Sequence, residues 1–133
     1  MSDGRTAVND KVFDSRLFFI NEEQVNTEVA NEIIRVIRKG GHIVIGIPNL
    51  SHLINRIYLL LGIQPMCIHL EGPHVRGFTH RAFKKYLISL EGTKLIAYSG
   101  ALMYPFPLII SKSLAKHFVG FSGYTCYLLK KIK

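Results

Sequence analysis

The stretch Arg35–Asn49, RVIRKGGHIVIGIPN, constrains the fold of this chain more than any other part of the sequence. An apolar stripe at helical spacing leads into Gly40–Gly41, a pair that favours the positive φ with which helices end. His42–Ile47 then forms a β-branched run that is too short for a helix, which is typical of a strand buried on both faces. Pro48 cannot continue such a strand. The stretch therefore predicts a helix, a tight turn and a central strand with helices on both faces.

The end of this strand is also where a functional rim is expected. In open α/β sheets, ligands bind outside the carboxyl ends of the strands. Pro48 and Asn49 should therefore lie at that rim. Asn49 has two interpretations: its side chain faces a pocket, or it caps a helix predicted at Leu50–Leu61. Capping needs only a short polar side chain before a helix and is the simpler of the two.

The remaining segments complete an α/β pattern in one domain, 1–133. Val12–Ile20 is a further strand candidate, and Met1–Lys11 is polar and expected to be a loose end. The final two strands are predicted to pair antiparallel. The other predicted helices are Glu22–Arg38, His80–Leu90 and Leu108–Phe118, and the other predicted strands are Lys94–Ser99 and Gly123–Lys131.

Composition narrows the class of protein. A hydrophobic content of 48% in 133 residues allows a real core, and a formal net charge of +8 favours acidic partners. The basic residues are dispersed and the aromatic residues do not alternate with them. This pattern is not typical of nucleic-acid binding, which therefore ranks last among the functions considered. Cys67 and Cys126 form no CxxC motif, the first residues contain no signal-like apolar run, and no apolar run is long enough to span a bilayer. A cytoplasmic protein without a transmembrane segment is expected.

Two further patterns have competing interpretations. Cys67, His69, His74 and His80 suggest zinc ligands, but they lack the paired spacing of zinc motifs, so no metal is predicted. The apolar segment Leu53–Ile63 could touch a membrane surface. A buried helix with Arg56 reaching out to solvent explains the same residues more simply.

Four motifs in a fixed order carry a family resemblance. They are RVIRKGG-HIVIGIPN, NRIYLLLG-IQP, GPHVRGFTHRAFKKYL and YTCYLLKK, within residues 28–133. Together they resemble the C-terminal half of a class I S-adenosylmethionine-dependent methyltransferase of the type 11/12 group. The resemblance implies a Rossmann-like sheet of strand order 3-2-1-4-5-7-6 with its last strand antiparallel. This chain would hold strands 4/5-7-6, with helices on both faces.

The resemblance also implies site residues. His74 and Arg76 fall in the family's His-x-Arg-x-Phe-Thr segment, which lies over the active-site rim. His74 would accept a proton from the methyl acceptor, and Arg76 would bind an anionic group of that substrate. Asn49 and Tyr104 would lie on the substrate side. The alternatives are a loop-organising His74, a structural Arg76 and a Tyr104 packed in the core.

The cofactor implied by the resemblance is S-adenosylmethionine, but two parts of its usual site are missing from this sequence. There is neither a GxGxG turn after an early strand nor an acidic residue ending the next strand, and Lys39 replaces a usual proline. The sequence therefore predicts the substrate-side half of a methyltransferase, active on an unidentified methyl acceptor only when the cofactor half is supplied elsewhere. An open sheet edge would then favour a homo-oligomer or a separate N-terminal half as partner. The alternative is a non-catalytic interaction protein that reuses this fold.

Overall fold

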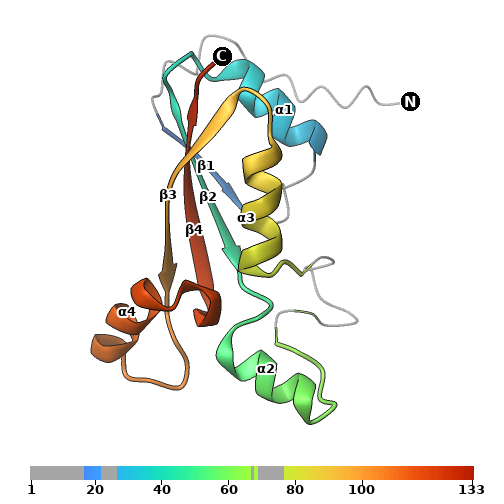
Figure 1. Ribbon diagram of the computed structural model, residues 1–133, viewed down its shortest axis with the longest axis vertical. Coiled ribbons are helices and arrows are strands. Elements are labelled where there is room, and N and C mark those ends of the chain that lie inside the picture. The colour runs from blue at the N-terminus through green and yellow to red at the C-terminus, as the bar shows by residue number, and fades with distance from the viewer. Residues whose placement is uncertain (1–16, 22–26, 67, 69–76) are drawn as a thin grey trace.

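The computed structural model describes residues 17–21, 27–66, 68 and 77–133, and they form an α/β fold (Figure 1). The predictions for Met1–Lys11 and for the first part of Val12–Ile20 lie outside these residues. The described elements, in chain order, are β1 Leu17–Asn21, α1 Thr27–Val36, β2 His42–Pro48, α2 Leu53–Leu60, α3 His80–Ser89, β3 Thr93–Ala101, α4 Leu108–His117, the 3-10 turn η2 Val119–Phe121 and β4 Tyr124–Lys131.

The strands form a four-stranded mixed sheet in the order β1-β2-β4-β3. Strands β1 and β2 are parallel, and β4 is antiparallel to both of its neighbours, β2 and β3. Ile45 lies between Ile20 on β1 and Tyr127 on β4, so β2 is a central strand as predicted. The antiparallel pairing predicted for the last two strands is also confirmed.

The core lies on one face of the sheet. Side chains along β2 alternate between buried and half-buried, with Ile43, Ile45 and Ile47 facing the core. Helices α1 and α3 cover this face (Figure 1). The prediction that β2 is buried on both faces is therefore wrong. The core residues are Ile37, Ile43, Ile45, Ile47, Phe83, Leu87, Tyr127 and Leu129.

The second face of β2 differs because of its residues. It carries His42, Val44 and Gly46, which alternate with the buried isoleucines and are only partly covered. The Tyr124 ring lies against Gly46: a Cβ added there would come within 2.6 Å of the Tyr124 hydroxyl. A histidine and a glycine in alternate positions cannot make the continuous apolar surface that a second layer of helices needs. In the described part of the chain, the helices that form the core pack on the other face.

Glycines and caps set most helix ends where the sequence predicts them. Gly40, Gly62 and Gly92 all have positive φ, between 70° and 81°, a conformation that glycine adopts without steric cost. The Thr79 hydroxyl accepts a hydrogen bond from the backbone N–H of Ala82 and caps α3. These four positions confirm the predicted ends.

Helix α2 departs from its prediction. It begins at Leu53 rather than Leu50, and its N-cap is His52. Its only buried residue is Asn55, whereas Leu60 and Leu61 are 85% and 68% exposed. The predicted burial of this helix is therefore wrong, because α2 extends past the end of the sheet instead of packing on its face (Figure 1). None of the described helices has the length and apolarity to cross a membrane.

Candidate functional site

The polar groups of the candidate site gather where β2 ends, around the fully buried side chain of Asn49. Its Nδ2 donates to the carbonyl oxygens of Gly120, at 3.0 Å, and Ser122, at 2.8 Å. Its Oδ1 accepts from the Ser51 hydroxyl, at 2.9 Å, and from the backbone N–H groups of Ser51 and His80. One amide thus joins the strand end, the segment before β4 and the first turn of α3.

These contacts decide between the two local interpretations of Asn49. Its side chain does not cap α2, because the Nδ1 atom of His52 accepts the hydrogen bond from the backbone N–H of Asn55. The predicted capping role is therefore wrong for α2. The Asn49 side chain is wholly covered by the chain, and Nδ2 and Oδ1 are both bonded to protein atoms. In this structure Asn49 positions neighbouring segments.

A second amide and an arginine fix α2 against the rest of the chain. Asn55 Nδ2 donates to the carbonyl oxygens of Leu50 and Met66, and its Oδ1 accepts from the Met66 N–H. Arg56 donates from Nε to the carbonyl of Ser51, at 2.7 Å, and its guanidinium stacks 4.2 Å from the centre of the Phe121 ring. Helix α2 is therefore fixed through Asn55 and Arg56 in its first half, despite the exposure of its other residues.

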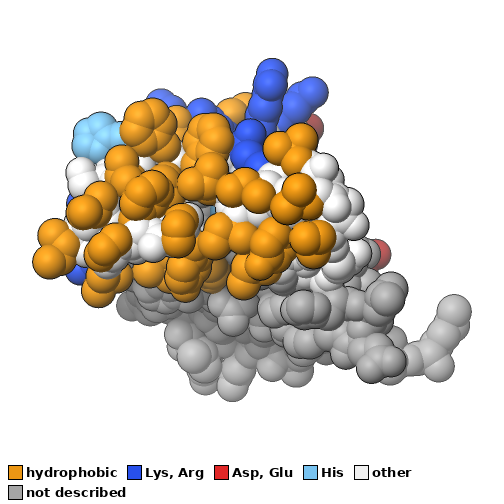
Figure 2. Space-filling model, turned by 90° about the horizontal axis from the view of Figure 1, so that it is seen from below, with side chains coloured by type: hydrophobic (Ala, Val, Ile, Leu, Met, Phe, Trp, Pro, Cys, Tyr) orange, Lys and Arg blue, Asp and Glu red, His pale blue; other side chains and the backbone are white. Residues whose placement is uncertain are grey.

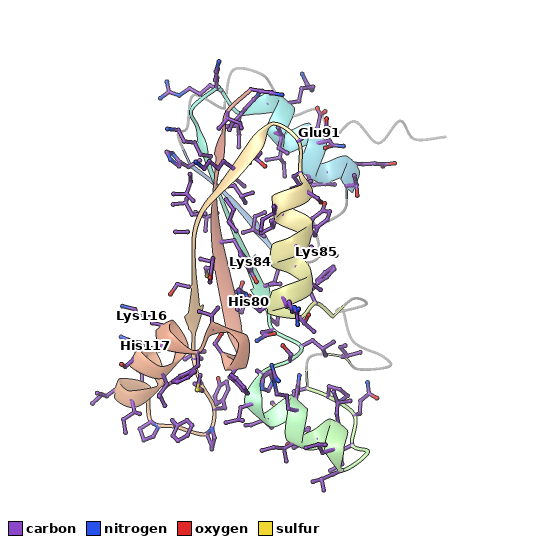
Figure 3. The ribbon with its side chains drawn as sticks, viewed as in Figure 1. His80, Lys84, Lys85, Glu91, Lys116 and His117 are labelled. Atoms are coloured by element: carbon purple, nitrogen blue, oxygen red, sulfur yellow. The ribbon has the colours of Figure 1, made fainter. Side chains whose placement is uncertain are left out.

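The chemically versatile group at the site is His80, in the first turn of α3 (Figure 3). Its Nδ1 lies 2.8 Å from the hydroxyl of Tyr127, and the two rings stack with centres 5.7 Å apart. Tyr98 on β3 lies against the same imidazole, and the ammonium of Lys84 donates to the Tyr98 hydroxyl. The cluster brings together α3, β3 and β4.

Burial tunes both members of the His80–Tyr127 pair. Burial, together with the nearby Lys84 cation, lowers the pKa of His80 below 6.5. Burial also raises the pKa of Tyr127 to about 12. Near neutral pH the imidazole is therefore uncharged and the phenol keeps its proton. A neutral imidazole at a partly exposed helix start can take part in proton transfer.

A shallow recess of about 380 Å³ lies beside this cluster, between α3 and β3. Lys84 and Lys94 supply its charge, and Ile88, Leu95 and Tyr98 supply apolar walls. The recess is therefore cationic and open to solvent.

The two predicted site residues that the structure describes, Asn49 and Tyr104, differ in solvent exposure. Asn49 is buried, whereas Tyr104 is 50% exposed and is not packed in the core. His74 and Arg76 lie outside the described residues, as do Cys67 and His69 of the considered zinc set. Across the ranges that the structure describes, no group of three or more His, Cys, Asp or Glu side chains could hold a metal ion.

Exposed apolar side chains form a second feature at the same end of the molecule. Figure 2 shows them spread over the lower end, which α2 and α4 form in Figure 1. We call this surface the apolar tip and define it by six exposed residues, Leu60, Leu61, Phe106, Leu108, Ile109 and Phe118. Tyr104 lies in the loop between β3 and α4.

Sequence reasoning missed the His80–Tyr127 pair and the α4 part of the apolar tip, and it ranked exposure of the α2 part below burial. His80 was singled out only as a zinc candidate, and no local pattern links it to a tyrosine 47 residues away. The sequence does contain an indication of the tip. Leu59, Leu60 and Leu61 are consecutive, so they cannot all lie on one buried face of a helix.

The described groups near the end of β2 include no carboxylate that could hold the ribose of S-adenosylmethionine. The resemblance implies a carboxylate on the ribose hydroxyls. The carboxylate side chains among the described residues are Glu28 and Glu32 on α1 and Glu91 after α3, at the other end of the sheet (Figures 1 and 3). The Asn49 amide, which ends the central strand, is already bonded within the chain. A scan against protein-family models finds none that matches this chain, and no curated protein matches it.

Proposed function

We propose that this chain forms the substrate-side half of a class I S-adenosylmethionine-dependent methyltransferase fold, and that residues outside this sequence supply the cofactor half. The order and directions of the strands carry the proposal. The sheet runs β1-β2-β4-β3 with β4 antiparallel to its neighbours. Strands 4-5-7-6 of that fold run in the same order, with strand 7 reversed.

Contacts among the motif residues support the proposal further. Asn49 ends the IGIPN motif, and Phe78 and Thr79 end the His-x-Arg-x-Phe-Thr segment. Asn49 and Phe78 form a parallel β-bridge, and the Leu50 N–H donates to the Phe78 carbonyl at 2.8 Å. Through its bond to the His80 N–H, Asn49 also fixes the start of α3. Asn49 is thus a positioning residue for Phe78 and for the start of α3.

The role proposed for this half is to hold the methyl acceptor. Methyl transfer gains most of its rate from placing the acceptor atom in line with the donor methyl group. The neutral imidazole of His80 lies at the rim and can assist loss of the acceptor's proton, alongside the role predicted for His74.

Calorimetry with S-adenosylmethionine tests the proposal on two samples. The isolated 133-residue chain should show no binding at low-micromolar concentrations, where a binder would gain about 8 kcal/mol. The native assembly, recovered through an affinity tag on this chain, should bind the cofactor and transfer labelled methyl groups to an acceptor.

Two results would overturn the proposal. Tight binding by the isolated chain would show that it holds its own cofactor site. A native assembly that binds no S-adenosylmethionine would instead favour the alternative, a non-catalytic interaction protein. The unpaired outer edge of β1 in the described sheet is the observation that favours this alternative.

A further inference from the structure

The apolar tip exposes large aliphatic side chains to a degree that is unusual for a surface in water. Ile109 is 87% exposed, Leu60 is 85% exposed and Leu61 is 68% exposed. They come from two helices that are separate in sequence, α2 and α4, and lie over one end of the molecule (Figure 2). Contiguous exposed apolar surface of this kind marks an interaction site.

Charge is distributed unevenly along the molecule. No Asp or Glu occurs between Ile33 and Leu70 or between Gly92 and Lys133. The described carboxylates are Glu28 and Glu32 on α1 and Glu91 after α3, at the end of the molecule opposite the tip (Figures 1 and 3). The described part of the tip end thus carries cations and apolar groups without a carboxylate.

Lysines continue the apolar side of α4. Lys112 follows Leu108 by four residues and Lys116 follows it by eight, so all three lie along one side of the helix. Both lysines are exposed, and Figure 3 shows Lys116 on α4. Their long stems allow the ammonium groups to reach beyond the apolar side chains beside them.

The two halves of the tip are held together before any partner binds. Arg56 on α2 donates from Nη2 to the Gly120 carbonyl, at 3.3 Å, and stacks on Phe121. On the other side, the buried hydroxyl of Ser111 accepts from the backbone N–H of Met103 and fixes α4 to the preceding loop. A surface fixed in this way loses little conformational freedom on binding.

We propose that the apolar tip docks on the surface of a bilayer that contains anionic phospholipids. The protruding aliphatic side chains would enter the boundary between headgroups and acyl chains, as in interfacial amphipathic helices. Lys112, Lys116 and Arg56 would face the anionic headgroups. A second copy fits less well, because two tips face to face would bring like charges together. This inference goes beyond the proposed function and does not depend on it.

Vesicle co-flotation of the full chain, without S-adenosylmethionine, tests the inference. Wild-type protein should bind vesicles of phosphatidylcholine with phosphatidylglycerol and show little binding to phosphatidylcholine alone. The double variant Leu60→Ser/Ile109→Ser should lose at least about tenfold in vesicle affinity, because each buried aliphatic side chain contributes to partitioning. The double variant Lys112→Gln/Lys116→Gln should lose about 25-fold, about fivefold for each lysine.

The matched control is Ile88→Ser/Lys39→Gln, which removes an exposed aliphatic side chain and an exposed cation away from the tip. It should bind vesicles as the wild type does. All of these positions are exposed, and circular dichroism checks that each variant is folded. Three outcomes would overturn the proposal. They are equal binding of the wild type and the tip variants, equal binding to vesicles with and without phosphatidylglycerol, and no vesicle binding at all. Tip substitutions that abolish self-association and leave vesicle binding unchanged would assign the surface to a second copy instead.

Discussion

At the scale of single residues, buried polar groups hold the candidate site together. Asn49 and Asn55 are both fully buried. Asn55 joins Leu50 and Met66, which lie on either side of α2, and Asn49 joins segments that are distant in sequence. His80 and Tyr127 do the same across α3 and β4. Because an unpaired buried polar group costs free energy, such residues specify one arrangement of loops rather than adding much net stability.

Replacing Asn49 with alanine should lower the free energy of unfolding by about 3 kcal/mol, because it leaves buried carbonyl and N–H groups without partners. Urea unfolding measures the change. Asn31→Ala, at an exposed position on α1, is the control and should stay within about 0.5 kcal/mol of wild type. An Asn49→Ala variant as stable as this control would show that the amide does not organise the site.

Stability should fall as the pH is lowered below the ordinary histidine value of 6.5. Burial lowers the pKa of both His80 and His52 in the folded chain, so the unfolded chain binds more protons in this range. The contribution is fully present above pH 6.5 and is lost as the pH falls through the lowered folded values.

Urea unfolding at a series of pH values measures this dependence. His80→Gln should make the dependence shallower, leaving the part that comes from His52. Ser113→Ala, at an exposed position on α4, removes no titratable group and should keep the wild-type dependence. A His80→Gln variant with the full wild-type slope would contradict the assignment.

At the scale of elements, close backbone approach decides how α4 meets the sheet. Gly100 on β3 is buried where the last part of α4 and the segment after η2 meet. A Cβ added there would contact the carbonyl oxygen of Ala115 and come within 2.6 Å of the Ser122 hydroxyl. Only a glycine at this position lets the Ala115 backbone of α4 approach β3 so closely.

Gly100→Ala should lower the free energy of unfolding by about 3 kcal/mol, because the added methyl group meets backbone that cannot move aside cheaply. Gly120→Ala is a matched control, since a Cβ there meets nothing within 4 Å. Chemical denaturation of the two variants compares them. Equal stability would mean that α4 is not packed against β3 at Gly100.

At the scale of the whole molecule, two surfaces of the described residues suggest partners. One is the apolar tip, and the other is the outer edge of β1, which no described strand pairs. An exposed strand edge presents unpaired N–H and C=O groups and favours pairing with another strand. The two surfaces predict different partners: a bilayer for the tip and polypeptide for the edge.

We expect the purified chain to associate through the β1 edge. Analytical ultracentrifugation should show a weight-average mass that rises with protein concentration. The Leu60→Ser/Ile109→Ser variant should associate to the same extent, because its changes lie away from the edge. A chain that stays monomeric at high concentration and unfolds cooperatively would contradict this expectation.

Local patterns in the sequence were sufficient to determine the element types. The glycines at 40, 62 and 92 and the cap at Thr79 end or begin elements where predicted, because turn geometry depends on a few adjacent residues. The β-branched run of β2 likewise predicted a central strand. Of the predicted site, only Asn49 and Tyr104 lie in the described residues, and the sequence did not foresee that Asn49 would be fully buried.

Tertiary structure alone decided which surfaces those elements bury. The apolar residues of Leu53–Ile63 predicted a buried helix, but α2 lies past the sheet and leaves Leu60 in solvent. The pairing of His80 with Tyr127 likewise needs β4 to return beside β2. Hydrophobic periodicity predicts the secondary structure of a segment, because that depends on residues near in sequence. Burial of the segment depends on which distant segments pack against it.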